Sequence, residues 1–505
     1  MRGAGWTIAT SVGSRALGLV GTILLTHLLV DPAIIGEVSD ASVLVMTANQ
    51  LSTIGVGQYL IAKPKSGRDV AWHATVFHLS LGFLAIGAIV LLRQRFTGVL
   101  GAPTMAEYVP GLAFAALLDR VTFIPERLLA RDMKFRVIGL SRTYGEISYT
   151  TFSVLMALLH FGGMAIVIGN VVRSLLRMVM IVGKANRADW LTPSRLSGKT
   201  MRSLLAFGLP FSVGASAGFA SRRWDNLLIS AMFGPGVMGE YNLAYNLADI
   251  PAVQVGEQIG DVLLPSFAHM DKESRKDALV RSTGMLALIV FPLAVGLGAI
   301  APTAVHTLLP KNWSNVAPML TILSALSIMR PVGWTVSSYL QACDKPRATM
   351  WLELLKVVFL LSCLYGLGHV GGAHAPLLAC VGVGVAFGAH ALASLAAVAR
   401  LDGVKMGAFF ARCVPPLITC VPMVLAVLGA RWLMAAVGID IRGVNLFVEI
   451  VAGAAGYVGS SFLIARNVTR ELLALVRSAR SRRGSSIPEG PRVSTDSVDD
   501  ASGPL

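Results

Sequence analysis

The chain has 505 residues, of which 54% are hydrophobic and only 14% are charged, and its formal net charge is +15 at pH 7. About a quarter of the residues in soluble domains are charged, so this composition excludes a soluble globular protein. Apolar stretches of about 18 to 25 residues recur along the whole chain, and each is long enough to cross a hydrocarbon layer of about 30 Å. We therefore expect an all-α polytopic membrane protein.

Charged residues and Gly, Pro or Asn separate these stretches and predict where each transmembrane helix begins and ends. About fourteen helices are expected, with approximate ranges 6–30, 34–62, 70–92, 106–129, 138–160, 163–183, 203–232, 236–266, 279–308, 316–341, 348–369, 373–399, 407–429 and 443–465.

Lysine and arginine residues are concentrated on alternate connections between these helices, and the tail from Arg466 to Arg483 is also basic. Positively charged connections stay in the cytoplasm, so both termini are expected to be cytoplasmic. Topology and attraction to anionic membrane lipid then account for the net charge. A nucleic-acid partner is not needed to explain it.

A short turn occurs twice. DPAIIGEV (residues 31–38) and GPGVMGEY (234–241) align Pro32 with Pro235 and Gly36 with Gly239, at an offset of 203 residues. Each turn joins two predicted helices, and six helices separate the turns. Because six is an even number, the two halves of the chain are predicted to insert in the same orientation.

A second pair of segments supports this duplication. LLARDMK (128–134) and LQACDKP (340–346) share L-x-A-x-D and align Asp132 with Asp344 at an offset of 212 residues. Two parallel six-helix bundles with the substrate path between them are a known plan of secondary transporters. We therefore predict two such bundles, which rock against each other, plus two extra C-terminal helices.

This plan divides the chain into segments of different character. They are an N-terminal six-helix bundle (1–183), a cytoplasmic connector (184–202), a C-terminal six-helix bundle (203–400), helices thirteen and fourteen (401–465), and a basic, disordered cytoplasmic tail (466–505). The tail is expected to begin with a basic, helix-like stretch (467–483) and to be disordered after it.

Several arginines fall inside predicted membrane helices, where an unpartnered charge costs about 2.5–3.5 kcal/mol. Arg15, Arg173, Arg177 and Arg330 have no carboxylate one turn away on their own helix, and Arg222 borders a face of small and polar residues. The planar guanidinium group suits phosphate oxygens. These five residues are therefore predicted to line a hydrated, cationic cavity between the bundles.

Acidic residues in the same helices have two alternative roles. Asp119, Asp249 and Glu257 either couple transport to H⁺ or Na⁺, because a buried carboxylate binds a proton more tightly, or serve as counter-ions of the arginines. The sequence has no nucleotide-binding motif, and no cofactor is expected.

A structural alternative applies to the charges as well. Arg222 and Asp225, and likewise Arg142 and Glu146, are spaced to form local pairs along one helix. Arg120 adds a further charge to the fourth predicted helix. Pairing of this kind would make the charges part of helix packing and not of a substrate site.

The chain resembles the polysaccharide-transporter branch of the multidrug/oligosaccharidyl-lipid/polysaccharide exporter superfamily, the Wzx-like flippases. The resemblance covers residues 1–465 and depends on the helix count, the duplicated halves, LLVDPAIIGEVSDASVLV after the first helix, and WDNLLIS…FG…GEYNLAYNLADIP in helices seven and eight.

The resemblance implies that the protein moves an undecaprenyl-diphosphate-linked oligosaccharide across the bacterial inner membrane for O-antigen, capsule or exopolysaccharide synthesis. The arginine set would bind the diphosphate. Membrane lipid and other polysaccharide-assembly proteins are the implied partners.

Two other transporters and one enzyme class are the alternatives. A lipid II flippase shares the superfamily, but its usual Arg-Asp, Asp-Ala-Phe and Pro-Asn run is missing here. A multidrug and toxic-compound extrusion antiporter would favour acidic cavity residues, whereas these helices carry arginines. A glycosyltransferase or polymerase needs a large outer loop with catalytic groups, and the predicted outer loops are short. Neither catalytic residues nor a metal site are predicted.

Overall fold

The computed structural model describes residues 17–62, 67–438 and 441–474, and this part of the chain contains helices and their connections only. The first half contains the helix Leu17–Leu28, α2 (Pro32–Leu51), α3 (Val56–Ala62), α4 (Arg68–Leu100), α5 (Met105–Arg131), α6 (Phe135–Leu158) and α7 (Met164–Lys184). The second half contains α8 (Gly198–Ala268), α9 (Lys272–Leu308), α10 (Val316–Leu326), α11 (Arg330–Ala342), α12 (Pro346–Val370), α13 (Ala375–Asp402), α14 (Met406–Val437) and α15 (Arg442–Leu463). Short 3-10 helices lie at Arg187–Asp189, Lys311–Trp313, Ser327–Met329 and Gly372–His374.

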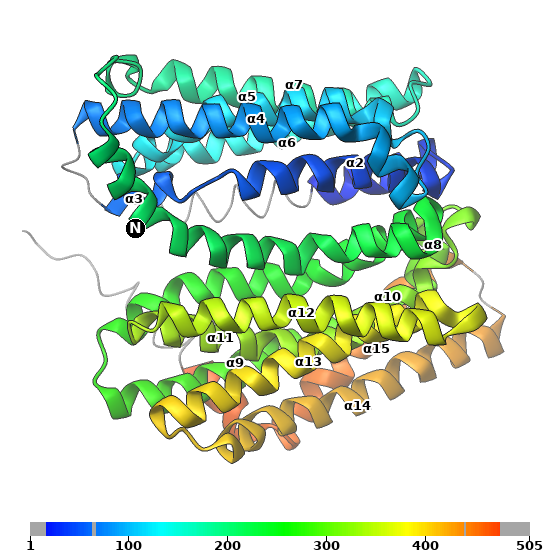
Figure 1. The fold of residues 1–505 in the computed structure, drawn as a ribbon. Helices are drawn as coiled ribbons and strands as arrows, with labels where there is room; N and C mark the ends of the chain where they lie inside the picture. Colours follow the sequence, from blue (N-terminus) through cyan, green and yellow to red (C-terminus); the bar gives the residue numbers. More distant parts are fainter. Residues whose placement is uncertain (1–16, 63–66, 439–440, 475–505) are drawn as a thin grey trace, which may run out of the picture.

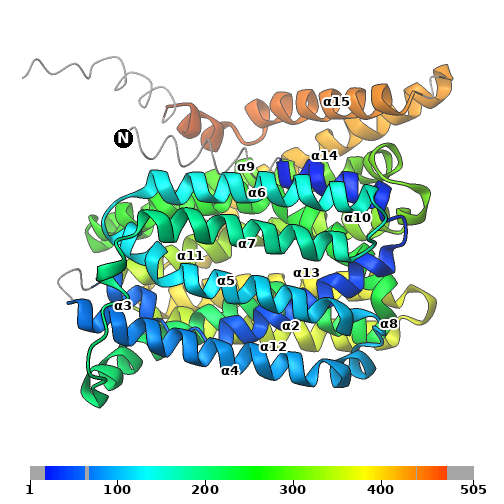
Figure 2. The same cartoon turned by 90° about the horizontal axis from the view of Figure 1, so that it is seen from above.

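The long helices run side by side and form two bundles (Figure 1). In the first bundle α2 packs on α5, α4 on α5, and α7 on α5 and α6. In the second, α9 packs on α10, and α12 on α13 and α8. The helices α14 and α15 pack on α9 at the outside of the second bundle (Figure 2).

Nine helices in the described part of the chain are long and apolar enough to cross a membrane, and the bent segment Gly198–Asp249 adds a tenth if it is counted as one. Their large exposed side chains, such as Leu84, Leu91 and Leu463, are 71%, 84% and 82% exposed, as expected where lipid takes the place of water. The protein is therefore a multi-pass membrane protein. The number of fourteen crossings stays a prediction.

The element α8 reverses direction at Gly234. This glycine has φ 82° and ψ 169°, outside the helical region. Tyr241 Oη donates a hydrogen bond of 2.7 Å to Asp225 Oδ2 although the two residues are 16 positions apart. A straight helix would separate them by about 24 Å. α8 therefore contains two antiparallel segments that meet at the GPGVMGEY turn, which agrees with the break predicted between 203–232 and 236–266.

Residues of the sequence also determine where other helices begin and end. The side chain of Asp31 accepts a hydrogen bond from Ala33 N, and Pro32 occupies the first turn of α2, where proline has no hydrogen bond to lose. Asp271 caps α9 in the same way through Ser274 N. Gly101 and Gly403 have positive φ (63° and 70°) and end α4 and α13, as glycine does at helix C-termini.

The repeated turns pack against each other. A Cβ atom on Gly36 would lie 1.9 Å from the carbonyl oxygen of Pro235, and one on Gly239 would lie 2.1 Å from that of Pro32. Only glycine allows two backbones to approach this closely. The contact is reciprocal, because each turn places its glycine on the proline of the other.

A hydrogen bond between equivalent residues continues this contact. Asn242 Nδ2 donates to Ser39 Oγ at 2.7 Å, and the two residues are 203 positions apart, the offset of the repeat. Residues that are related by a two-fold axis contact each other only near the axis. The repeated turns therefore lie where a two-fold relation between the halves would place the axis.

The glutamate that follows each glycine has an equivalent role in each half. Glu37 Oε1 accepts a hydrogen bond of 3.3 Å from Thr104 N, just before α5. Glu240 Oε1 accepts one of 3.1 Å from Asn315 Nδ2, just before α10. The repeated Gly-Glu therefore combines a close backbone contact between the halves with a polar contact inside each half.

The second predicted landmark is wrong by one residue. After α5 the chain turns at Met133 (φ 59°), and after α11 it turns at Asp344 (φ 55°). Both turns are closed by a backbone hydrogen bond of 2.9 Å, from Lys134 N to Leu129 O and from Lys345 N to Leu340 O. The structural offset is thus 211, and Asp344 matches Met133 and not Asp132. The alignment of identical residues was off by one position because the equivalence of the two turns depends on backbone geometry and not on residue type.

The halves also touch at the opposite end of α2. A Cβ atom on Gly208, near the start of α8, would lie 2.7 Å from the carbonyl oxygen of Ile54. Ser212 Oγ donates a hydrogen bond of 3.0 Å to Thr53 O. The first segment of α8 thus contacts the first bundle at the break between α2 and α3.

The tail, expected to be basic and helix-like over 467–483, begins with a helix in the described part of the chain. Residues 466–474 are helical, and buried Ala465 and Val468 pack with apolar residues of α9 and α14. The apolar positions of this short helix therefore hold it against the second bundle. The remainder of the tail, 475–505, lies outside the described residues.

Candidate functional site

The structure describes six of the eight predicted site residues. Arg15 lies outside the described residues, and Glu257 lies outside the described side chains. The other six are Asp119, Arg173, Arg177, Arg222, Asp249 and Arg330.

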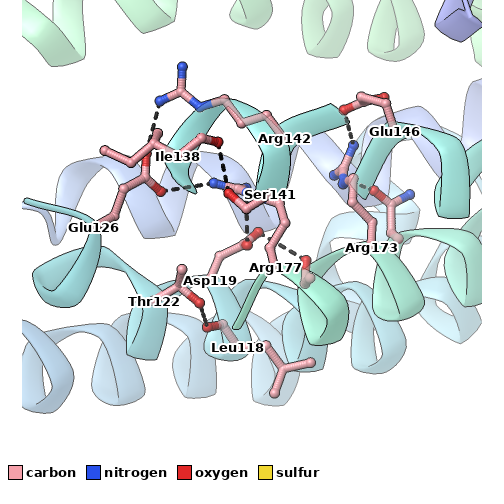
Figure 3. Close-up of polar contacts among 12 residues, drawn as sticks. Leu118, Asp119, Thr122, Glu126, Ile138, Ser141, Arg142, Glu146, Arg173 and Arg177 are labelled. Carbon is pink, nitrogen blue, oxygen red and sulfur yellow. Dashed lines mark hydrogen bonds and ion pairs between the residues drawn. The ribbon is translucent and has the colours of Figure 1, made fainter. Parts of the chain in front are cut away.

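A network of ion pairs joins three helices of the first bundle (Figure 3). Arg177 on α7 lies 3.4 Å from Asp119 and 3.0 Å from Glu126, both on α5. Arg142 on α6 lies 2.8 Å from the other oxygen of Glu126. Ser174 Oγ also donates to Asp119 at 3.1 Å. Each carboxylate therefore has a cation from a neighbouring helix.

Arg173 on α7 forms a separate ion pair beside this network (Figure 3). Its guanidinium lies 3.7 Å from Glu146 on α6 and donates a hydrogen bond of 2.6 Å to Asn170 Oδ1. It also lies 5.3 Å from the centre of the Tyr149 ring, within the range of a cation–π contact. The network of Asp119, Glu126, Arg142 and Arg177 and the separate pair of Glu146 and Arg173 each have a formal charge of zero.

The second bundle contains a similar pair. Arg330, at the start of α11, forms an ion pair with Asp249 on the second segment of α8. Its guanidinium carbon lies 5.4 Å from the ring centre of Tyr245 and 4.7 Å from that of Phe387. Arg330 is 11% exposed and Asp249 20% exposed at the side chain. The pair lies between aromatic rings inside the bundle.

The two local pairs considered from the sequence do not form. Arg142 binds Glu126, while Glu146 binds Arg173. Asp225 is fully buried and accepts hydrogen bonds from Tyr241 Oη and Asn226 N. Here the packing of neighbouring helices brings other partners within reach, which is why spacing within one helix misassigned these partners.

These contacts correct one step of the sequence argument. Arg173, Arg177 and Arg330 lack a carboxylate on their own helix, but each has one on a neighbouring helix. Unmatched positive charge is therefore no longer a reason to assign these three to an anionic substrate. Their role in substrate binding stays a prediction.

Arg222 is different from these three. It is exposed on the first segment of α8, and within the described residues it has no ion pair or hydrogen bond. Arg223 beside it is half-buried and also has none there. Two residues after Arg222, Trp224 Nε1 donates a hydrogen bond of 3.2 Å to Thr47 Oγ1 on α2. Arg222 therefore lies on the helix that contacts both bundles and retains an available guanidinium.

Arg120 is a buried cation whose environment the sequence did not reveal. It is 2% exposed, and within the described residues its partners are uncharged oxygens and the ring nitrogen Nδ1 of His78. Nε donates a hydrogen bond of 2.6 Å to Asn49 Oδ1. Nη1 donates one of 2.9 Å to His78 O and one of 3.4 Å to Ser52 O. Asn49 and Ser52 lie at the C-terminus of α2, where the helix dipole is negative. A helix end thus replaces the carboxylate.

The predicted cavity between the bundles stays a prediction. The structure has a cleft of about 670 Å³, but this cleft lies between α9, α14 and residues 464–468. Among the described residues no group of three or more His, Cys, Asp or Glu side chains is arranged to hold a metal ion.

Comparison with known proteins identifies a family. A family model described as "Polysaccharide biosynthesis protein" matches residues 25–318, which is more than half of the chain and includes both repeated turns.

Two curated relatives cover most of the chain. The lipopolysaccharide biosynthesis protein WzxC of Escherichia coli K12 is 24% identical over 74% of this chain and 75% of its own length. The succinoglycan biosynthesis transport protein ExoT of Rhizobium meliloti is 25% identical over 97% of each chain.

Two solved structures share the fold. A lipid II flippase, MurJ, in an inward closed conformation superposes with a TM-score of 0.74 at 14% identity, over 92% of this chain and 99% of that one. An inward-facing multidrug transporter of the MATE family superposes with a TM-score of 0.61 at 13% identity, over 77% and 96%. At these identities the likeness concerns the fold alone.

Proposed function

The chain belongs to the polysaccharide biosynthesis protein family, and from this membership we propose that it is a flippase for a lipid-linked oligosaccharide. It moves an undecaprenyl-diphosphate-linked repeat unit from the inner to the outer leaflet of the bacterial inner membrane, with both termini in the cytoplasm. The relatives WzxC and ExoT, named for polysaccharide biosynthesis and transport, support this proposal.

The observation that supports a substrate-binding site is that the guanidinium of Arg222 has no partner in the described part of the chain. A diphosphate needs a cation that has not been neutralised, and Arg222 is exposed without an ion pair in the described part of the chain. It lies ten residues before the end of the predicted helix 203–232, about 15 Å along the axis, near the middle of the membrane. A guanidinium there stabilises an anionic headgroup during its passage.

The ion pairs have a different role in this proposal. Asp119 and Asp249 act as counter-ions that allow Arg177 and Arg330 to remain charged inside the bundles. They hold each bundle together as a rigid body, while the two bundles rock against each other and the contact between the repeated turns opens.

The test of the function is glycan export in cells that lack the gene. Wild-type protein should restore surface polysaccharide and clear the lipid-linked oligosaccharide that accumulates. Arg222→Gln should reduce export by about 10-fold to 150-fold, because a hydrogen bond to a charged group contributes about 1.5–3 kcal/mol. Protein level in the membrane is measured by immunoblot in each strain.

Arg195→Gln is the matched control, since Arg195 is also exposed but lies in the predicted connector. It should export normally. Normal export by Arg222→Gln would remove this residue from the site. If the deletion strain accumulates no lipid-linked oligosaccharide but loses resistance to cationic drugs, the flippase proposal is wrong and the antiporter alternative is correct.

A further inference from the structure

The cleft of about 670 Å³ lies away from the contact between the bundles. Its walls are the first turns of α9 and α14 and the residues that follow α15. Both α9 and α14 begin at basic connections that are predicted to be cytoplasmic. The cleft therefore opens at one end of the bundle, at the level of the lipid headgroups.

Three arginines line the cleft, Arg281 on α9, Arg412 on α14 and Arg466 after α15. Glu471 lies 2.7 Å from Arg412 and 3.6 Å from Arg281. One carboxylate is thus shared by two guanidiniums, which brings these groups close together. Arg466 is exposed and has no partner among the described residues.

The charge of the cleft is positive. Its lining contains one carboxylate, Asp277, and Glu471 adds a second, against three guanidiniums. Arg470, which is exposed four residues after Arg466, adds a further positive charge to this short helix. The three guanidiniums exceed the two carboxylates by one charge, and guanidinium groups favour a phosphate, whose oxygens accept paired N–H bonds.

The remainder of the lining is apolar and includes Val280, Ala411, Pro415 and Ile464. Ile464 is 41% exposed, and the preceding Leu463 is 82% exposed, so the apolar wall continues onto the lipid-facing surface. Cationic groups at the membrane end with an apolar wall beside them match the two parts of a phospholipid.

We propose that this cleft binds the phosphate headgroup of an anionic phospholipid, with the acyl chains along α9, α14 and α15. The site is separate from the translocation path. The bound phosphate bridges Arg281, Arg412 and Arg466, and it holds the terminal helix 466–474 against the second bundle, where Val468 is already buried.

The test uses the full-length protein in nanodiscs of phosphatidylcholine with or without phosphatidylglycerol. Native mass spectrometry counts the phosphatidylglycerol retained, and thermal unfolding reports its stabilisation. Each arginine near anionic lipid contributes about fivefold in affinity. Arg281→Gln/Arg412→Gln/Arg466→Gln should therefore lower retention by about 100-fold, and phosphatidylglycerol should no longer raise its Tm.

The matched control is Arg195→Gln/Arg347→Gln/Arg400→Gln, which removes three exposed arginines outside the cleft and should retain the lipid as wild type does. Arg466→Gln alone breaks no ion pair of the described structure, so it tests the site without a folding defect, and it should lower retention about fivefold. Equal retention by wild type and Arg466→Gln would overturn the proposal. Displacement of the lipid by millimolar glycerol phosphate would also overturn it, because the site would then bind free phosphate.

Discussion

Arg330 and Asp249 illustrate how charged side chains are accommodated inside apolar helices. Each lies on a different helix of the second bundle, and the guanidinium makes cation–π contacts with two aromatic rings. A buried pair of this kind contributes little net stability, but loss of one partner leaves an uncompensated charge. The same reasoning applies to Arg177 with Asp119 and Glu126.

This geometry predicts a double-mutant result. Asp249→Asn and Arg330→Gln should each lower stability by about 3 kcal/mol, and the double variant should be close to wild type because no charge is left unpaired. Thermal unfolding in detergent and glycan export measure the effect.

Failure of Arg330→Gln to rescue the export of Asp249→Asn would contradict the counter-ion role. Asp249 would then be the ion-coupling carboxylate, the alternative that the sequence left open.

At the scale of elements, the repeated turns explain why the chain keeps glycine at two positions 203 residues apart. In each turn a backbone carbonyl of the partner turn occupies the space of a side chain. The glutamate that follows each glycine accepts a hydrogen bond from the loop before α5 in the first half and before α10 in the second half. The repeated turns therefore form a contact surface to which both halves contribute equally.

Substitution of these glycines should separate the turns. Gly36→Ala and Gly239→Ala place Cβ 1.9 Å and 2.1 Å from backbone oxygens, so the backbones have to move, at a cost of about 1–3 kcal/mol. We expect at least a tenfold loss of export. Size-exclusion chromatography of the solubilised variants shows whether they remain folded.

Gly236→Ala is the control within the same turn. Its Cβ would meet no atom within 4 Å, and alanine favours a helix, so export should be unchanged. An effect as large as that of Gly36→Ala would show that the turn is sensitive to any substitution and that close contact is not the cause.

At the scale of the whole molecule, alternating access requires contacts between the bundles to open while contacts inside each bundle persist. The hydrogen bond from Asn242 to Ser39 joins the bundles at the repeated turns. The contact between Thr283 Oγ1 and Thr335 Oγ1, 2.8 Å, lies within the second bundle. These two contacts should therefore respond differently when they are locked.

Locking the first contact should stop transport. Ser39→Cys/Asn242→Cys, without the five native cysteines, should cross-link with a short bis-methanethiosulfonate, which forms a disulfide with each thiol and releases methanesulfinate. The cross-linked protein should lose at least nine-tenths of export, and a reducing agent that cleaves the disulfides should restore it. Thr283→Cys/Thr335→Cys should cross-link with export intact. Full export by the cross-linked Ser39/Asn242 variant would exclude opening at this contact.

Much of this protein follows from local sequence patterns. Apolar stretches predict membrane helices because crossing the hydrocarbon layer requires a minimum length of apolar side chains. The offset of 203 residues predicts that the two turns are equivalent, and the hydrogen bond between Ser39 and Asn242 agrees with it. The same patterns supported the family resemblance.

The partners of the charged residues were decided by tertiary structure alone. The sequence suggested Glu146 for Arg142, but the rotation and packing of α5, α6 and α7 bring Glu126 to it. Likewise α2 ends where its carbonyl oxygens can bind Arg120. Spacing along one helix is local information, whereas ion pairs and clefts depend on how distant helices face each other, which only the packed bundle determines.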